Sequence, residues 1–367
     1  MPTAGSVTLR LSTKQPSLTA ELPRRTSDFD YQLPPDLIAQ EPLPDRAASR
    51  LLVVRRHEGG AGSGTLSDSM FHHLPDLIPP GDVVVVNTTK VRHARLIGRR
   101  ASGAPAEVLL IHPATDGAWV ALGKPGSALR PGKRVVLDTE VWVEVERVLP
   151  SGHRIVRIHG TTPDDAMRRF GRVPLPPYIA REPTATDATR YQTVYAEREG
   201  SVAAPTAGLH FTPTLLERLR GQGIGLIGID LEVGPGTFQP VEAEFTKDHA
   251  MHPERFEIPP ATAARIADAR SQGAKIWAVG TTVVRALESA AVAGTVQAGR
   301  HETRLLIIPG YHFRVVDRLV TNFHLPRSTL LMLVSAFAGF DLIRQAYRHA
   351  IAQRYRFYSY GDAMVII

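Results

Sequence analysis

The sequence predicts an α/β protein with a small all-β barrel inserted into it, and three observations support this fold class. Residues 82–87 (DVVVVN) are a β-branched run, typical of a strand buried on both faces. From residue 185 onward, strand-like and helix-like segments alternate. Between about 93 and 163, helical periodicity is absent and short alternating segments follow at even spacing. We therefore expect an α/β core domain of residues 28–92 and 164–367, and a β-barrel domain of residues 93–163.

The first residues of the chain show no pattern typical of a helix or a strand. Residues 1–27 are rich in Ser, Thr and Pro and lack the apolar run of a secretory signal, so we expect a disordered extension. Residues 29–43 indicate an extended segment tied onto the fold, and residues 49–54 predict the first strand. The longest apolar run, at 330–337, is too short to cross a bilayer. We expect no membrane partner and a cytoplasmic location.

The predicted barrel is followed by a helix and a Pro-rich loop over residues 164–180. The barrel strands are expected in RLIGRR, AEVLLI, AWVALG, KRVVLD, VWVEVERVL and HRIVRIH. Four side chains after them are candidate contacts to a nucleic-acid backbone: Arg168, Arg169, Arg172 and the aromatic Tyr178. The alternative is a solvated helix face followed by a rigid connector.

Two glycine-containing loops flank a helix and a strand between residues 202 and 241. Thr212 and Pro213 predict a helix start, and residues 224–230 predict a buried strand. The loop after this strand offers close backbone approach and polar side chains, so we expect it to bind a ligand at the carboxyl end of the sheet. Its candidate residues are Glu232, Gly234, Gly236, Thr237 and Gln239. The alternative is a pair of tight turns with no ligand.

The C-terminal part predicts further strands and helices with a second candidate loop. Helices are expected at 261–272, from Thr281 or Thr282 to 292, after Ser328 and at 341–353, with strands at 275–279, 304–308 and 314–321. Gly280, Thr281 and Thr282 lie at a predicted helix N-terminus, which suits a carboxylate or phosphate. Arg285 and Glu288 are three residues apart on this helix and are candidates to pair with each other.

Charge and cysteine content limit the chemistry. The chain has 43 Lys and Arg against 36 Asp and Glu, a net charge of +7. This favours a polyanion such as RNA, although a basic enzyme without such a partner has the same balance. The absence of cysteine excludes disulfides, a thiol nucleophile and cysteine-ligated metal centres.

Histidines are the main candidate acid–base groups. His210 and His324 each stand beside a Phe at a predicted loop or strand end, and both titrate near neutrality when exposed. His249 and His252 lie in DHAMHPE (248–254), where the spacing is poor for a metal and Pro253 favours a loop. We expect no metal site there. Each histidine is alternatively a structural residue.

Several long strings closely resemble the S-adenosylmethionine:tRNA ribosyltransferase-isomerase family of queuosine biosynthesis. They are TAGLHF (206–211), VGPGTFQPV (233–241), DHAMHPE (248–254), AVGTTVVRALES (278–289), VVDRLVTNFHLPRSTLLMLVSAFAG (315–339) and YRFYSYGDAMVI (355–366). The resemblance spans about residue 28 to the C-terminus. It implies an α/β core with an inserted barrel, in agreement with the pattern above.

The resemblance also implies a reaction. The ribosyl part of S-adenosylmethionine moves onto the aminomethyl group of a 7-deazaguanine base at the tRNA wobble position, rearranges to an epoxycyclopentane, and adenine and methionine leave. No cofactor is implied beyond S-adenosylmethionine as a substrate; the oligomeric state is left open. His210, His249, His252 and His324 are then candidate proton handlers, and Gly280, Thr281, Thr282 and Arg285 candidates for the methionine carboxylate. Thr206 and Asn322 are further substrate-binding candidates.

The chain departs from the family pattern in several loops. Glu232 and Asp68 stand where the family commonly has His, Thr88 where it has Asn or Asp, and Arg92-His93 and Pro105-Ala106 replace other residues. Two alternatives therefore stand beside the family reaction. One is a paralogue that acts on a small-molecule acceptor, and the other is an RNA-binding protein without turnover. Glu232 is the feature that most favours these alternatives.

Overall fold

The structure is a computed structural model and describes residues 25–57, 63–234, 236 and 241–367. The expected disordered extension therefore lies outside the described residues, except for residues 25–27. Those three are ordered: Thr26–Phe29 is a 3-10 turn in which Thr26 and Phe29 are buried. The Thr26 backbone N–H donates to the carbonyl of Glu244 at 2.9 Å, so this segment is anchored to the core.

The core contains a nine-stranded sheet in the order β18-β14-β13-β3-β15-β19-β20-β1-β2. Its four central strands, β13, β3, β15 and β19, are parallel to one another. Their carboxyl ends therefore meet at one edge of the sheet. The strands are β1 Arg50–Arg56, β2 Gly64–Met70, β3 Val83–Asn87, β13 Gly225–Leu231, β14 Glu254–Ile258, β15 Ile276–Val279, β18 Gly299–Thr303, β19 Arg318–Asn322 and β20 Ala363–Ile366.

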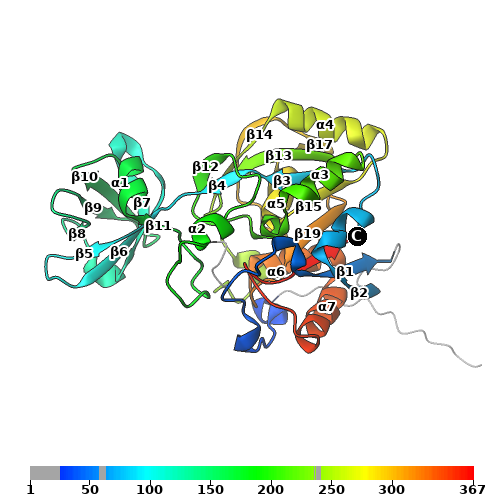
Figure 1. Cartoon of the computed structure of the whole chain (residues 1–367), viewed down its shortest axis with the longest axis horizontal. Coiled ribbons are helices and arrows are strands. Elements are labelled where there is room, and N and C mark those ends of the chain that lie inside the picture. Colours follow the sequence, from blue (N-terminus) through cyan, green and yellow to red (C-terminus); the bar gives the residue numbers. More distant parts are fainter. Residues whose placement is uncertain (1–24, 58–62, 235, 237–240) are drawn as a thin grey trace, which may run out of the picture.

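Helices cover both faces of this sheet (Figure 1). The period-2 alternation of the strands divides the core into two hydrophobic clusters. One cluster contains Val83, Val85 and residues of α4 to α7. The other contains Val84, Val86 and residues of α3. The helices are α1 Pro163–Phe170, α2 Asp187–Arg190, α3 Pro213–Gly221, α4 Pro260–Ser271, α5 Thr281–Ser289, α6 Thr329–Ala338 and α7 Phe340–Ala352. The expected caps Thr212 and Ser328 are confirmed, each accepting from a backbone N–H three residues on.

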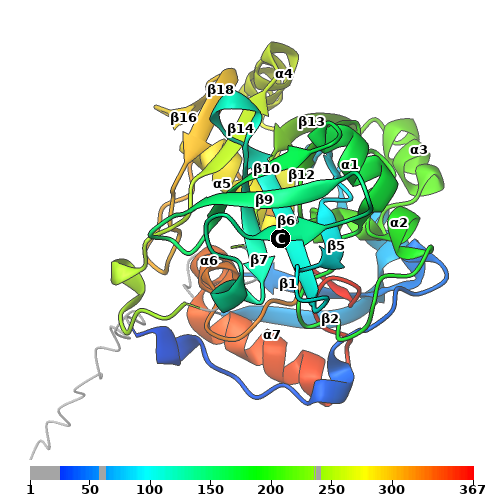
Figure 2. The ribbon, with the colours of Figure 1, turned by 90° about the vertical axis from the view of Figure 1, so that its left-hand side faces the viewer.

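The second lobe is an antiparallel barrel, confirming the inserted all-β unit. Its strands run in the order β11-β5-β6-β7-β10-β9-β8, and pairing of β5 with β8 closes it. Figure 2 looks from this side, with the barrel strands in front of the core. The strands are β5 Arg95–Arg99, β6 Pro105–Pro113, β7 Trp119–Lys124, β8 Arg134–Val136, β9 Trp142–Val148, β10 Arg154–His159 and β11 Gly171–Arg172. Two short pairs, one parallel and one antiparallel, complete the strands: β4 Thr89–Val91 with β12 Arg198–Ser201, and β16 Ala291–Val292 with β17 Thr295–Val296.

Three sequence expectations differ from the structure. Helix α1, expected with the core, contributes Ala166 and Met167 to the hydrophobic cluster of the barrel. The strand expected at 304–308 is irregular, because pairing with β14 ends at Thr303 and the next apolar side chains pack without a ladder partner. Helix α5 is capped by Gly280 and not by a threonine, and it ends at Ser289.

In the described part of the chain, no single helix is long and apolar enough to cross a membrane. Only α6 and α7 taken together reach the required length and composition, and the pair is bent by 114°.

Candidate active site

A pocket opens at the carboxyl edge of the central strands. It is lined by residues that follow β13 and β15, by the end of β19, by the loop at 204–207 and by Tyr358 and Ser359. Its empty volume, including the part open to solvent, is about 520 Å³. Ligands of parallel α/β sheets bind at this edge. Seven sequence-predicted residues lie in its wall: Tyr178, Thr206, Gly280, Thr281, Thr282, Asn322 and His324.

The N-terminus of α5 supplies the pocket with backbone donors. Gly280 adopts φ +95° and ψ 149°, a conformation that strongly favours glycine, and its N–H donates to the Val320 carbonyl at 2.8 Å. Gly280, the N-cap residue, has no side chain with which to cap the helix. The first N–H groups of α5 have no intrahelical partner. Together with the helix dipole, they make this wall favourable for an anionic group.

Asn322 in the pocket wall and His210 next to it are two buried polar side chains. Asn322 donates through Nδ2 to the Tyr358 carbonyl at 2.9 Å, while its Oδ1 has no hydrogen-bond partner among the described residues. His210 is 4% exposed, and its Nδ1 lies 2.7 Å from the Ser49 hydroxyl. Burial lowers the pKa of His210 to about 4, and the nearby Asn322 side chain only partly opposes that shift. His210 is therefore a neutral imidazole at pH 7.

His324 is a second neutral imidazole, in the wall of the pocket. Its Nε2 lies 2.8 Å from the hydroxyl of Thr321, and its backbone N–H donates to the Tyr347 hydroxyl. The Tyr31 hydroxyl donates to its carbonyl oxygen. Burial lowers the pKa of His324 to about 3. The imidazole is therefore neutral at pH 7 and has an unprotonated nitrogen that can accept a proton, although the same burial makes it a weak base.

These two histidines predict a pH dependence of stability. Their pKa values are lower in the folded protein than the ordinary 6.5, so the unfolded chain binds more protons as pH falls below 6.5. The free energy of unfolding should therefore fall between pH 6.5 and about 4. In His324→Gln or His210→Gln, the slope against pH in this window should be smaller by about 1.4 kcal/mol per pH unit. Urea unfolding at several pH values measures the slope, and an unchanged slope in both variants would contradict it.

Arg285 does not reach the pocket, contrary to its expected role at the methionine carboxylate. Its side chain is 4% exposed, forms an ion pair with Glu254 of β14 and donates through Nε to the Leu305 carbonyl. It also does not pair with Glu288, which accepts from the backbone N–H groups of 314–316. Arg285 therefore holds β14 against α5.

Glu232 also lies outside the pocket. Leu231 and Val233 on either side are buried and Val233 lines the pocket, so strand alternation turns Glu232 outward, where it is exposed. The other ligand-loop departures do not line the pocket either. Asp68 accepts from Tyr355 and contacts His349, and Thr88 donates to the Ile229 carbonyl. Arg92 lies over the Trp119 ring.

This placement predicts that Glu232→His changes catalysis little. Because the side chain is exposed and points away from the pocket wall, we expect kcat/KM for the reaction that the resemblance implies to change less than about threefold, as for a surface substitution. Steady-state kinetics of the variant and the unchanged protein measure this. A loss of tenfold or more would show that Glu232 contacts a substrate.

The remaining predicted residues lie outside the pocket wall or outside the described residues. His249 and His252 follow the 3-10 turn Thr246–Asp248 and do not line the pocket; the His252 ring faces His153 of the barrel, with centroids 6.3 Å apart. Gly234 is described and lies outside the pocket wall, while Gly236 packs near His252. Thr237 and Gln239 lie outside the described residues. No group of three or more His, Asp or Glu residues in the described ranges is placed to hold a metal.

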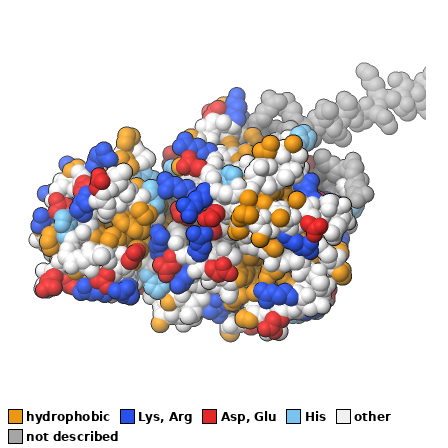
Figure 3. Space-filling model, turned by 90° about the horizontal axis from the view of Figure 1, so that it is seen from above, with side chains coloured by type: hydrophobic (Ala, Val, Ile, Leu, Met, Phe, Trp, Pro, Cys, Tyr) orange, Lys and Arg blue, Asp and Glu red, His pale blue; other side chains and the backbone are white. Residues whose placement is uncertain are grey.

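The predicted RNA contacts divide into two groups. Arg168 and Arg169 on α1 pair with Asp165, and Arg172 pairs with Glu182. Tyr178 instead lies in the pocket wall, where its hydroxyl is 2.6 Å from that of Ser359. Figure 3 shows Lys and Arg side chains, mixed with acidic ones, gathered between the barrel and the core on the face seen from above.

Sequence reasoning missed several residues of the site, among them Thr321, Tyr358, Ser359 and Ser49. Tyr358 and Ser359 line the pocket, and Ser49 holds His210. Tyr358 has φ +71°, unusual for a residue other than glycine. Tyr358 and Ser359 lie in the family-like motif at 355–366, which could have indicated them. The aromatic and small residues of this motif, however, show no charge pattern that marks a site. Ser49 is 161 positions from His210, and no local pattern connects them.

Comparison with known proteins places the chain in one family over nearly its whole length. The family profile described as Queuosine biosynthesis protein matches residues 26–366. The S-adenosylmethionine:tRNA ribosyltransferase-isomerase of Thiobacillus denitrificans is 51% identical, covering 93% of this chain and 97% of that protein. The enzyme of the same name from Paraburkholderia phytofirmans is 52% identical, with the same coverage. The crystal structure of the S-adenosylmethionine tRNA ribosyltransferase of Thermotoga maritima matches with a TM-score of 0.54 and 35% identity, covering 93% of this chain and all of that one. The chain belongs to the queuosine biosynthesis family of S-adenosylmethionine:tRNA ribosyltransferase-isomerases.

Proposed function

We propose that this protein transfers the ribosyl moiety of S-adenosylmethionine to a 7-aminomethyl-7-deazaguanine base at the wobble position of tRNA. The product is epoxyqueuosine in the RNA, with release of adenine and methionine. The observation that carries the proposal is full-length family membership: relatives about half identical over 93% of this chain bear the name of this enzyme. The pocket at the carboxyl edge of the sheet supports it.

The pocket offers groups for each part of the sulfonium substrate. The positive sulfur acidifies the adjacent 5′ carbon, so removal of a proton there begins the elimination that releases adenine. His324 is our candidate proton acceptor, because it lies in the pocket wall and its imidazole is neutral at pH 7. One of its ring nitrogens therefore carries no proton. The N-terminus of α5 is our candidate cradle for the methionine carboxylate. Asn322 offers its unpaired Oδ1 to a substrate donor.

The proposal needs no cofactor beyond S-adenosylmethionine as a substrate, and it implies a cytoplasmic protein that meets tRNA. The test is to measure adenine release by chromatography, with tRNA that carries 7-aminomethyl-7-deazaguanine. We expect release with this tRNA and none with unmodified tRNA or without RNA. Release without RNA would indicate a small-molecule acceptor, and RNA binding with no release in any mixture would indicate a protein without turnover. Either result would overturn the proposal.

A further inference from the structure

A second hollow, which we call the arginine hollow, lies next to the pocket. Arg46, Ser49, Arg190, His210, Ser359 and Tyr360 are among the residues in its wall. Its empty volume is about 290 Å³, including the part open to solvent. Ser359 lines both hollows, and the Asn322 side chain of the pocket influences the pKa of His210 in the arginine hollow. A ligand in one hollow therefore lies beside a ligand in the other.

Among the described residues, no carboxylate pairs with the arginines of this hollow. Arg46 donates to the carbonyl oxygens of Thr189, Arg190 and Leu209, and Arg190 donates to that of Pro44. The Nε of Arg190 is buried and has no hydrogen-bond partner in the described ranges. Neither guanidinium has a carboxylate within 4 Å in the part of the chain that the structure describes. The two positive charges are thus held by carbonyl dipoles alone.

A third arginine borders the hollow. Arg356 donates to the carbonyl of Glu41, next to the lining residue Pro42, and its NH1 is buried without a hydrogen-bond partner among the described residues. Its charge acts on His210, as does that of Arg46. Burial lowers the pKa of Arg356 and outweighs the nearby Asp362 carboxylate. Burial, followed by Arg190, lowers the pKa of Arg46 to about 10. The mutual repulsion of partly buried cations is relieved when an anion enters.

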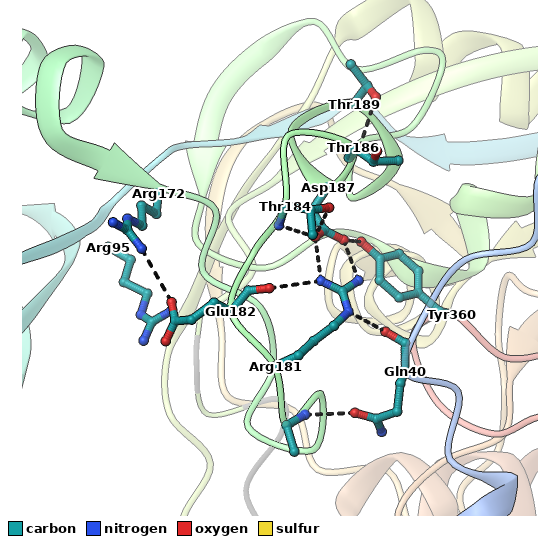
Figure 4. Close-up of polar contacts among 11 residues, drawn as sticks. Gln40, Arg95, Arg172, Arg181, Glu182, Thr184, Thr186, Asp187, Thr189 and Tyr360 are labelled. Carbon is teal, nitrogen blue, oxygen red and sulfur yellow. Dashed lines mark hydrogen bonds and ion pairs between the residues drawn. The ribbon is translucent and has the colours of Figure 1, made fainter.

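The wall that carries Arg190 is held rigid by a polar network (Figure 4). Asp187, at the start of α2, is buried and accepts two hydrogen bonds from Arg181, at 2.7 and 3.0 Å. It also accepts from Tyr360, itself part of the hollow, at 2.7 Å. Arg181 in turn donates to the Gln40 carbonyl. Within this network, the charges of Arg181 and Asp187 pair with each other, and their bonds fix α2 in place. Arg190 at the end of α2 is therefore preorganised.

We propose that the arginine hollow binds a backbone phosphate of the tRNA beside the nucleotide whose base enters the pocket. This inference rests on the proposed function, since it assumes RNA as the acceptor. A phosphodiester fits better than the carboxylate of S-adenosylmethionine for two reasons. Two guanidinium groups line this hollow and a third borders it, and planar guanidinium forks match phosphate oxygens. The hollow also lies outside the pocket in which α5 already offers N–H groups for a carboxylate.

The test is Arg190→Gln, because this side chain makes only one carbonyl contact and its loss leaves the Arg46 contacts in place. Binding of the modified tRNA is measured by filter retention over a range of salt concentrations. We expect affinity at low salt to fall at least tenfold, and the slope of log K against log salt to shrink by about 0.7 to 0.9, as for one lost phosphate contact. The KM for S-adenosylmethionine should stay unchanged. The matched control is Arg265→Gln on α4, an arginine that pairs with Asp268 and lies outside both hollows.

A second variant keeps the test decisive. Arg356→Gln removes a charge from a different element, so the same loss of RNA affinity and salt slope is expected if Arg190→Gln fails to fold. Thermal unfolding identifies such a failure. A raised KM for S-adenosylmethionine with unchanged RNA binding would assign the hollow to the methionine carboxylate and overturn the inference. RNA binding equal to that of Arg265→Gln would also overturn it. Because RNA binding is measured without turnover, the result is separate from adenine release, on which the proposed function depends.

Discussion

Asn322→Ala is expected to lower kcat for adenine release about a hundredfold, the cost of removing one preorganised hydrogen-bonding group from an active site. Asn322 ends β19 in the pocket wall, and its Oδ1 has no partner among the described residues. The change also removes the bond to the Tyr358 carbonyl, which holds the strained Tyr358 in place. Single-turnover adenine release with saturating substrates measures the chemical step directly.

The matched control is Asn87→Ala. Asn87 ends β3, which β15 separates from β19 in the sheet, and is equally buried. Its amide bonds to backbone groups of Leu231 and Thr89 outside the pocket. We expect it to lose stability, because three backbone groups lose their partner, while keeping its single-turnover rate at a temperature where it is folded. Equal rate losses in the two variants would mean that Asn322 acts only through the fold.

Gly280→Ala is expected to lower the stability by about 1 to 3 kcal/mol and to lower kcat/KM for S-adenosylmethionine at least tenfold. A Cβ at φ +95° strains the backbone, whatever the space around it. Relief of this strain moves the first turn of α5, and with it the N–H groups that we propose for the methionine carboxylate. Urea unfolding and steady-state kinetics measure the two effects.

Gly339→Ala separates these two effects. Gly339 precedes α7 with φ 94° and ψ 140°, nearly the angles of Gly280, and does not line the pocket. The two variants should lose similar stability, and only Gly280→Ala should lose affinity for S-adenosylmethionine. If Gly339→Ala impairs catalysis as strongly, the loss reflects strain alone and the anion-binding role of α5 is wrong.

The sequence predicted the parts of the site that local signals determine. Parallel strands bring their carboxyl ends together, so a strand followed by Gly280 to Thr282 and another ending in Asn322 had to meet at one edge. Thr212 and Ser328 are caps whose side chains bond within three residues, and these predictions were confirmed. The six barrel strands followed from alternation and turn residues alone.

Contacts between distant residues determine the rest. Arg285 was expected at a ligand because it follows the α5 N-terminus, but its charge is taken by Glu254, 31 positions away on an adjoining strand. Glu232 could have been predicted correctly, since alternation with buried Leu231 and Val233 turns it outward. The arginine hollow was not predictable, because Arg46, Arg190 and Arg356 come from three separate segments and each is held by backbone carbonyls that are distant in sequence.

The central claim is that the pocket between α5, β19 and Ser359 holds the reacting substrate. A crystal structure of this protein with S-adenosylmethionine tests it most directly. We expect the sulfonium substrate in the pocket, with its carboxylate within hydrogen-bond distance of the Thr281 and Thr282 N–H groups and its 5′ carbon facing His324. Ordered S-adenosylmethionine elsewhere, with the first turn of α5 left uncontacted, would contradict the account.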